Sequence, residues 1–303
     1  NSSKKLAALR TIIKKNKLSG LLVQRTDMFQ GEEVRSCDER LAFISGFTGS
    51  AGYALILLNI AALFSDQRYS LQMKNQTDPS EWNCYDSMTV NIKELLLNTD
   101  GLGSMLIIGY DSWVMTTGQV EKLPKSAGDI SIKWVALKKS LIDEIWEDRP
   151  QKHFVEYWYM PNNIAGITAK QKIINLFEAQ GINDNSTVIL VSSVDSANWL
   201  LNIRGNALTH TPYFHAMLLV FSADSIAIIT EQKQEKAIEI DGLDIKHYEF
   251  NEIEKLIKMV SEKKVQIDKA TCPHGLLECF YKKDISIEFK SNTVLDMKSQ
   301  KNE

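Results

Sequence analysis

No apolar run in this sequence is long enough to cross a membrane. The longest extends from Ala51 to Phe64, is interrupted by Asn59, and falls short of the ~20 residues that a spanning helix needs. We interpret it as two neighbouring buried strands. The beginning of the chain also lacks the apolar segment of a signal peptide. We therefore expect no membrane partner.

Cysteine is scarce. Four cysteines in 303 residues do not form a disulfide framework in a chain of this length. They are Cys37, Cys84, Cys272 and Cys279. We therefore expect free thiols, a reducing compartment and a cytoplasmic location.

Excess positive charge is absent too. The formal net charge is -3 at pH 7, which argues against a nucleic-acid partner because such a partner requires a basic surface. Apolar residues make up 44% of the chain and charged residues 24%, an ordinary balance for a globular protein. The length indicates about two domains.

The motifs of several common enzyme classes are missing. No H-E-x-x-H pair, phosphate-binding G-x-x-x-x-G-K-[ST] loop or G-x-S-x-G nucleophile turn occurs. Cys272, His274 and Cys279 lie close together, but their spacing is not one that zinc sites use. The glycine-rich stretch from Ser45 to Gly52 is better explained as a tight turn where backbones approach closely. We predict no catalytic residue and no metal ligand.

The elements that are present alternate between helices and strands, which predicts an α/β fold of mixed sheets flanked by helices. In the first half we expect a helix over 5–20 that ends at Gly20, and a short strand over 21–24. A strand-and-turn region over 43–52 and a hairpin over 53–65 follow.

The second half repeats this order. Thr168 and Gln171 form a capping pattern at the start of a helix that Gly181 ends, and a buried strand follows from Val188. A second hairpin covers 216–230. Asn251 and Glu254 predict a second capping box, at the start of a later helix. The shared order suggests two related domains in tandem.

Proline marks the boundary between the halves. Pro150 and Pro161 interrupt helical continuity on either side of a polar segment. We expect a first domain over residues 1–155, a second over 161–295, and the start of a linker over 296–303.

Several segments, in this order along the chain, resemble the N-terminal part of Xaa-Pro aminopeptidases (aminopeptidase P) of the creatinase/prolidase superfamily. They are DERLAFISGFTGSAGYALI (38–56), AALFSDQRYSLQ (61–72), GYDSW (109–113), LIDEIWEDRP (141–150) and DSANWLLNIRGNALTHTPYFHAMLLV (195–220). The resemblance implies two tandem creatinase N-terminal-like domains. Gln67, Ser70 and Ser112 depart from the residues usual in that family.

The same resemblance implies a third, C-terminal pita-bread domain that holds two metal ions, typically manganese, on two Asp, one His and two Glu. There a metal-bound water attacks the bond before a penultimate proline. None of those ligands can be matched to a residue here. We therefore expect this chain to lack the catalytic domain and to have no catalytic role by itself.

The implied role is assembly and substrate access in a homo-oligomer, beside the chain's own C-terminal catalytic domain and peptides with a penultimate proline. Arg40, Phe47, Arg204 and His210 are candidates for surfaces that face the cleft or a partner; Arg204 is notable because it ends an apolar run, where a guanidinium needs a partner. The alternatives are a free-standing inactive binding or scaffold protein of creatinase-like fold, and a creatinase-like hydrolase for another small substrate.

Overall fold

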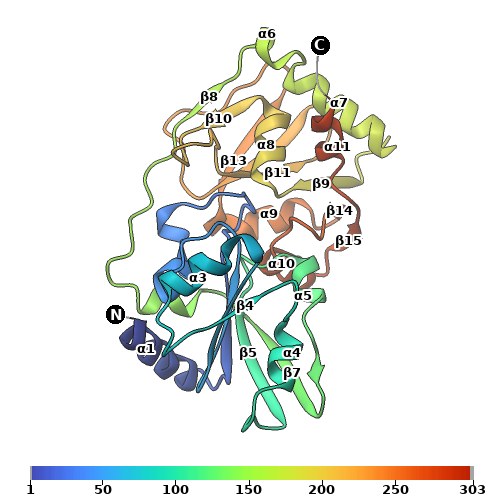
Figure 1. Ribbon diagram of the computed structural model, residues 1–303. Helices are drawn as coiled ribbons and strands as arrows, with labels where there is room; N and C mark the ends of the chain where they lie inside the picture. The colour runs from blue at the N-terminus through green and yellow to red at the C-terminus, as the bar shows by residue number, and fades with distance from the viewer. Residues whose placement is uncertain (1, 301–303) are drawn as a thin grey trace. The chain divides into compact units, whose positions relative to one another are not determined.

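The computed structural model describes residues 2–300 and divides the chain into two units (Figure 1). The division falls between Gln151 and Lys152, and the second unit also includes Met28–Gly31 and Thr116–Gly118. Each unit contains its own sheet. We describe the two units one at a time.

A mixed seven-stranded sheet forms the centre of the first unit, in the order β4-β3-β2-β1-β5-β7-β6. Antiparallel pairs join β1 to β2, β2 to β3 and β6 to β7, whereas the other pairs are parallel. The strands are β1 (Gly20–Gln24), β2 (Tyr53–Leu57), β3 (Ala61–Ser65), β4 (Asn83–Asp86), β5 (Met105–Asp111), β6 (Ser126–Ala127) and β7 (Ile130–Leu137).

Helices cover both faces of this sheet. Because side chains alternate along a strand, Leu21 and Val23 pack with helices α1 and α2, while Leu22 packs with α4 on the opposite face. This double burial explains why the strands are apolar along their whole length. The helices up to Glu121 are α1 (Ser2–Lys15), α2 (Arg40–Ser45), α3 (Ser70–Gln76), α4 (Ile92–Leu97) and α5 (Thr117–Glu121), with short 3-10 turns at Ser36–Asp38, Gln67–Tyr69 and Leu141–Glu144.

The prediction that Gly20 caps the first helix is wrong. The helix ends at Lys15, Lys17 takes the left-handed conformation with φ of 57°, and Leu18 N donates to Ile13 O at 3.1 Å. Gly20 instead begins β1. A Cβ at that position would lie 2.8 Å from Ile56 O on the neighbouring strand, so the glycine is required by close strand approach.

The strand predicted within 43–52 is also wrong. Residues Arg40–Ser45 form α2, and Gly46 ends it in the left-handed conformation with φ of 85°. Gly46 N donates to Ala42 O at 2.8 Å, which satisfies one of the carbonyls left open at the helix end. The predicted hairpin over 53–65 is present as β2 and β3.

A six-stranded sheet forms the centre of the second unit, in the order β13-β12-β11-β9-β14-β15, and β8 and β10 form a separate pair. Its strands are β8 (Tyr157–Tyr159), β9 (Thr187–Val191), β10 (Ile203–Gly205), β11 (Ala216–Val220), β12 (Ser225–Thr230), β13 (Asp244–Glu249), β14 (Lys264–Ile267) and β15 (Ser286–Phe289). Its helices are α6 (Asn162–Ala165), α7 (Ala169–Gln180), α8 (Val194–Leu201), α9 (Ile253–Met259), α10 (His274–Tyr281) and α11 (Thr293–Ser299).

The two sheets share one topology. Read from β4 to β7 and from β13 to β15, both run parallel, antiparallel, antiparallel, parallel and parallel. The shared strand order and sense agree with the repeated order of elements in the sequence. The predicted fold class, two tandem α/β domains with mixed sheets, is confirmed.

The caps of the second unit are predicted only in part. Thr168 accepts a hydrogen bond from Gln171 N at 3.2 Å, and Gly181 ends α7 in the left-handed conformation, as expected. The capping box predicted at Asn251 and Glu254 is wrong, because Glu249 and Glu252 form it two residues earlier. A 3-10 turn over Phe250–Glu252 precedes α9 and displaces the cap.

Candidate functional site

Arg40 lies in the first turn of α2 and binds Asp143 with two parallel hydrogen bonds. Its Nε donates to Asp143 Oδ1 at 2.8 Å, and its Nη2 donates to Asp143 Oδ2 at 3.0 Å. Its Nη1 lies 3.4 Å from Asp38 Oδ1. Burial alone would lower the pKa of Arg40, but the hydrogen bonds and charge of Asp143 outweigh it and raise that pKa.

Further charges surround this pair. We call Arg35, Asp38, Arg40, Asp143 and Arg149 the charge cluster. Arg149 lies 2.7 Å from Asp143 and 3.4 Å from Asp38, and Arg35 lies 2.8 Å from Asp38. Each carboxylate of the cluster thus has at least two cations. All three guanidine nitrogens of Arg40 have carboxylate partners, so its visible role is to hold α2 and the 3-10 turn at Leu141–Glu144 together.

Phe47 is a core residue of the first unit. Its side chain is 1% exposed and its ring packs edge-on against Tyr69, with ring centroids 5.6 Å apart. A Cβ at Gly49 would lie 2.1 Å from the ring, so glycine is needed there to make room for the aromatic side chain. The glycine-rich stretch is therefore a turn that closes over Phe47. The side chain of Phe47 itself offers no surface to a partner.

Arg204 lies on β10 and is half-buried. Its Nη1 donates to two backbone carbonyls, Ile203 O at 2.9 Å and Asn198 O at 3.3 Å. Among residues 2–300, no carboxylate forms an ion pair with it. We expected the guanidinium of Arg204 to need a partner, and its partners are uncharged backbone oxygens. Burial lowers the pKa of Arg204.

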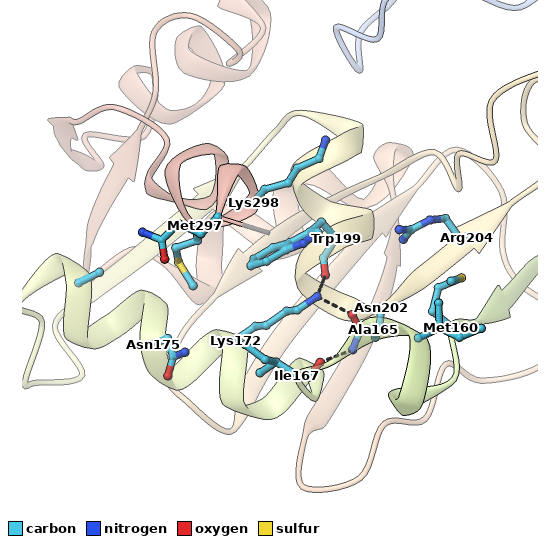
Figure 2. Close-up of a pocket in the computed structure, with 13 residues that line it drawn as sticks. Met160, Ala165, Ile167, Lys172, Asn175, Trp199, Asn202, Arg204, Met297 and Lys298 are labelled. Carbon is cyan, nitrogen blue, oxygen red and sulfur yellow. Dashed lines mark hydrogen bonds between the residues drawn. The ribbon is translucent and has the colours of Figure 1, made fainter. Parts of the chain in front are cut away.

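A pocket with a volume of about 580 Å³ opens beside Arg204 in the second unit (Figure 2). Its walls come from the α6 region, α7, the end of α8, β10 and α11. His210, an exposed loop residue, does not line it. Of the four residues singled out in the sequence, Arg204 alone reaches this pocket.

Sequence reasoning missed the most unusual residue of the pocket, Lys172. Its side chain is 3% exposed, and its Nζ donates to Asn202 Oδ1 at 2.6 Å and to Trp199 O at 2.9 Å (Figure 2). The amine also lies 3.9 Å from the centre of the Trp199 ring, a cation-π distance. Its spacing in the sequence could have indicated its burial, because Lys172 lies three residues after Ala169 and four before Leu176, on the buried face of α7.

The environment of Lys172 disfavours its charged form. Burial, and secondly the positive charge of Arg204, lower its pKa to about 8. The pocket therefore brings together two cations, and neither has a carboxylate partner among residues 2–300. Such an arrangement can hold an anion. A bound anion would stabilise the buried positive charges and would reduce the repulsion between Lys172 and Arg204.

No metal site accompanies these features in the part of the chain that the structure describes. Within residues 2–300, no three His, Cys, Asp or Glu side chains are grouped so that they could hold a metal ion. Cys272 is buried, and burial raises the pKa of its thiol, which makes it a poor ligand. The four cysteines are free thiols, as predicted.

Sequence comparison places this architecture in a family. Two family models, both described as the Creatinase/Prolidase N-terminal domain, match residues 5–145 and 148–303. The chain belongs to the creatinase/prolidase N-terminal domain family. Its resemblance to the N-terminal, two-domain portion of Xaa-Pro aminopeptidases is confirmed.

Curated relatives bear the aminopeptidase name. A protein named Probable Xaa-Pro aminopeptidase P from Coprinopsis cinerea is 31% identical over 85% of this chain and 42% of its own length. Aminopeptidase P1 of Lotus japonicus is 31% identical over 80% of this chain and 37% of its own length. The chain thus spans less than half the length of these relatives.

A solved structure shares the fold over the whole chain. The X-prolyl aminopeptidase of Caenorhabditis elegans, described as a cytosolic enzyme with a di-nuclear active site, aligns with a TM-score of 0.83 at 23% identity. The alignment covers 100% of this chain and 52% of that one. As for membranes, the described residues include no helix with the length and apolar character needed to span one.

Proposed function

We propose that this chain is the non-catalytic N-terminal region of a metal-dependent Xaa-Pro aminopeptidase, which removes an N-terminal residue that precedes proline. The observation that supports it is the pair of adjacent creatinase/prolidase N-terminal domains, together with relatives of that name more than twice as long as the matched region. A cytoplasmic location follows the same resemblance.

The proposed contribution of these two domains is subunit assembly and restriction of substrate access. Two manganese or similar divalent ions would lie in a further, C-terminal domain, where they would activate water and polarise the scissile carbonyl. The candidates for contacts with that domain or with a second subunit are Arg204, His210 and the stretch from Arg40 to Phe47, apart from the buried Phe47 ring. Their roles are a prediction carried over from the resemblance.

The test is an activity comparison between two proteins. The first is the 303-residue chain and the second is the product of its gene read on beyond residue 303, each assayed with excess manganese on an Xaa-Pro-Xaa peptide and on an Xaa-Ala-Xaa control. We expect proline-dependent cleavage by the longer protein alone. Cleavage by the 303-residue chain would disprove the non-catalytic role, and inactivity of a metal-loaded longer protein would disprove the peptidase assignment.

The access role has its own readout. In the longer protein, Arg204→Ala and His210→Ala should change the oligomeric state or the preference for short peptides. The oligomeric state is measured by light scattering, and the preference by kcat/KM on tripeptides and decapeptides. Unchanged values for both variants would remove these residues from the proposed role.

A second function rests on the pocket beside Arg204, which a free-standing binding protein of creatinase-like fold could use. The gene beyond residue 303 separates this alternative from the first proposal. A stop codon at that point would favour the binding protein.

A further inference from the structure

We propose that the pocket of the second unit binds a small organic carboxylate, with the carboxylate group on Arg204 and Lys172 and the apolar body against Trp199. This inference does not depend on the aminopeptidase proposal. It rests on three features: the positive charges that face the pocket, the geometry of their hydrogen-bond donors, and the apolar side chains of the walls.

Two of the positive charges around the pocket have no carboxylate partner among residues 2–300. None of the residues between 2 and 300 that line it is acidic. Arg204 is bonded through Nη1 to backbone carbonyls, and Lys172 is bonded to a carbonyl and an amide oxygen. Lys298 also lines the pocket, but it is paired with Asp195 at 2.7 Å. The deficit of negative charge is therefore concentrated at Arg204 and Lys172.

The geometry of these two cations suits a carboxylate. A guanidinium presents its donors in a planar fork that matches the two oxygens of a carboxylate. With Nη1 of Arg204 on carbonyls, its Nε and Nη2 are the donors without a protein acceptor among residues 2–300. Figure 2 shows Arg204 and Lys172 reaching toward the same region from two different elements, β10 and α7.

The walls indicate that the anion carries an apolar body. Met160, Ile164, Ile167, Trp199 and Met297 line the pocket, and Ile164 is 63% exposed although it is a large apolar residue. Burying such side chains against an apolar ligand is favourable. The volume of about 580 Å³ lies within the range of small-molecule sites. An inorganic phosphate would leave these walls in contact with water.

Binding of a carboxylate would also change the protonation of Lys172. Its pKa of about 8 is set by burial and by Arg204, and a nearby negative charge would raise it. Below pH 8 the amine is mostly charged and attracts the ligand; above pH 8 it is mostly neutral. The affinity should therefore fall several-fold between pH 7 and pH 9, although the ligand itself stays ionised throughout.

The test is calorimetric titration of the 303-residue protein with 3-phenylpropanoate, its neutral amide and inorganic phosphate. We expect the carboxylate to bind with a Kd below about 1 mM and the amide to bind at least about tenfold more weakly, because a hydrogen-bonded charge pair is worth this much. Phosphate should bind no more tightly than the amide.

Two variants localise the binding. Arg204→Gln keeps a polar side chain but removes the charge, and it should weaken the carboxylate about tenfold or more while leaving the amide unchanged. Lys172→Met should abolish the decline in affinity between pH 7 and pH 9. Arg68→Gln is the matched control, since that arginine is exposed on the first unit. Unchanged melting temperatures would show that the variants are folded.

Several results would overturn the proposal. Equal affinity for acid and amide would show that no cation recognises the ligand. Phosphate bound as tightly as the carboxylate would show an unspecific anion site, and full affinity in Arg204→Gln would place binding elsewhere. No heat from the carboxylate up to 10 mM would show that the pocket does not serve this class of ligand.

Discussion

Arg40 and Arg204 are two arginines removed from bulk water in different ways. Arg40 is satisfied by charge, because Asp143 binds its guanidinium with two bonds and Asp38 lies beside it. Arg204 is satisfied by dipoles, because two backbone carbonyls accept from one of its nitrogens. The first arrangement is complete within the protein, and the second leaves donors available to a ligand. The residue type alone does not show that Arg40 is structural and that Arg204 has donors free for a ligand.

The charge cluster gives a stability prediction at this scale. Arg40→Leu would leave Asp143 and Asp38 with Arg149 and Arg35 as their partners while removing a side chain that is only 11% exposed. Because both carboxylates keep another cation, the loss is that of the charge-assisted hydrogen bonds of Arg40 and of its packing, and the free energy of unfolding should fall by about 2 kcal/mol. Urea denaturation measures this change.

The control is Arg68→Leu, which breaks an exposed ion pair with Asp66 in the same unit. Exposed pairs contribute little, so this variant should unfold at the wild-type urea concentration. A loss in Arg40→Leu no larger than that in Arg68→Leu would contradict the structural role of the cluster.

At the scale of elements, the start of α4 has a capping box that can be tested. Asn91 accepts from Glu94 N at 3.1 Å, and the Glu94 side chain accepts from Asn91 N at 2.8 Å. Asn91→Ala should lower the free energy of unfolding by about 1 kcal/mol, because Glu94 N loses the Asn91 side-chain acceptor. Asn91→Ser, which restores an acceptor, should recover most of the loss. Equal losses in both variants would show that the cap contributes nothing.

The elements also show how far the sequence predicts the fold. The strands within 53–65 and 216–230 are predictable from the sequence. A strand that is buried on both faces is apolar at every position, and such a short continuous apolar run is typical of a buried strand. The helix over Arg40–Ser45 was missed because six residues give too short a pattern, and glycines follow it at once. The cap at Glu249 was missed because glutamate is uncommon as an N-cap and Asn251 is favoured.

The candidate site was less predictable than the fold for a physical reason. Lys172, Trp199 and Arg204 are separated in sequence and meet only because α7, α8 and β10 pack together. Arg204 is a candidate from the sequence because it is a charged residue at the end of an apolar run. The sequence does not predict the burial of Lys172, because a lysine on a helix is ordinarily solvated and its burial depends on tertiary packing.

At the scale of the whole molecule, the segment that joins the two units consists mostly of exposed residues. Residues 149–156 form neither helix nor strand, and the side chain of Lys152 is 40% exposed. Trypsin should therefore cut early after Lys152, since unstructured exposed segments adapt to a protease. Arg149 should resist, because Pro150 follows it. Mass spectrometry of a short digest should show products ending at Lys152.

Lys152→Gln is the matched control for this digest. It removes the cleavage site and should delay the appearance of two fragments of similar size. Early cleavage confined to other lysines, with Lys152 intact, would show that the segment is protected in solution.

Asn202 limits how this pocket can change over evolutionary time. It ends α8 in the left-handed conformation with φ of 54°, accepts from Lys172 Nζ through Oδ1, and donates through Nδ2 to Ile167 O at 2.8 Å. Glycine would adopt the backbone but has no side chain, and aspartate would accept from Lys172 but cannot donate to Ile167. A lineage can exchange the apolar walls and thereby alter its ligand, whereas we expect a lineage that keeps the buried lysine to keep asparagine at this position.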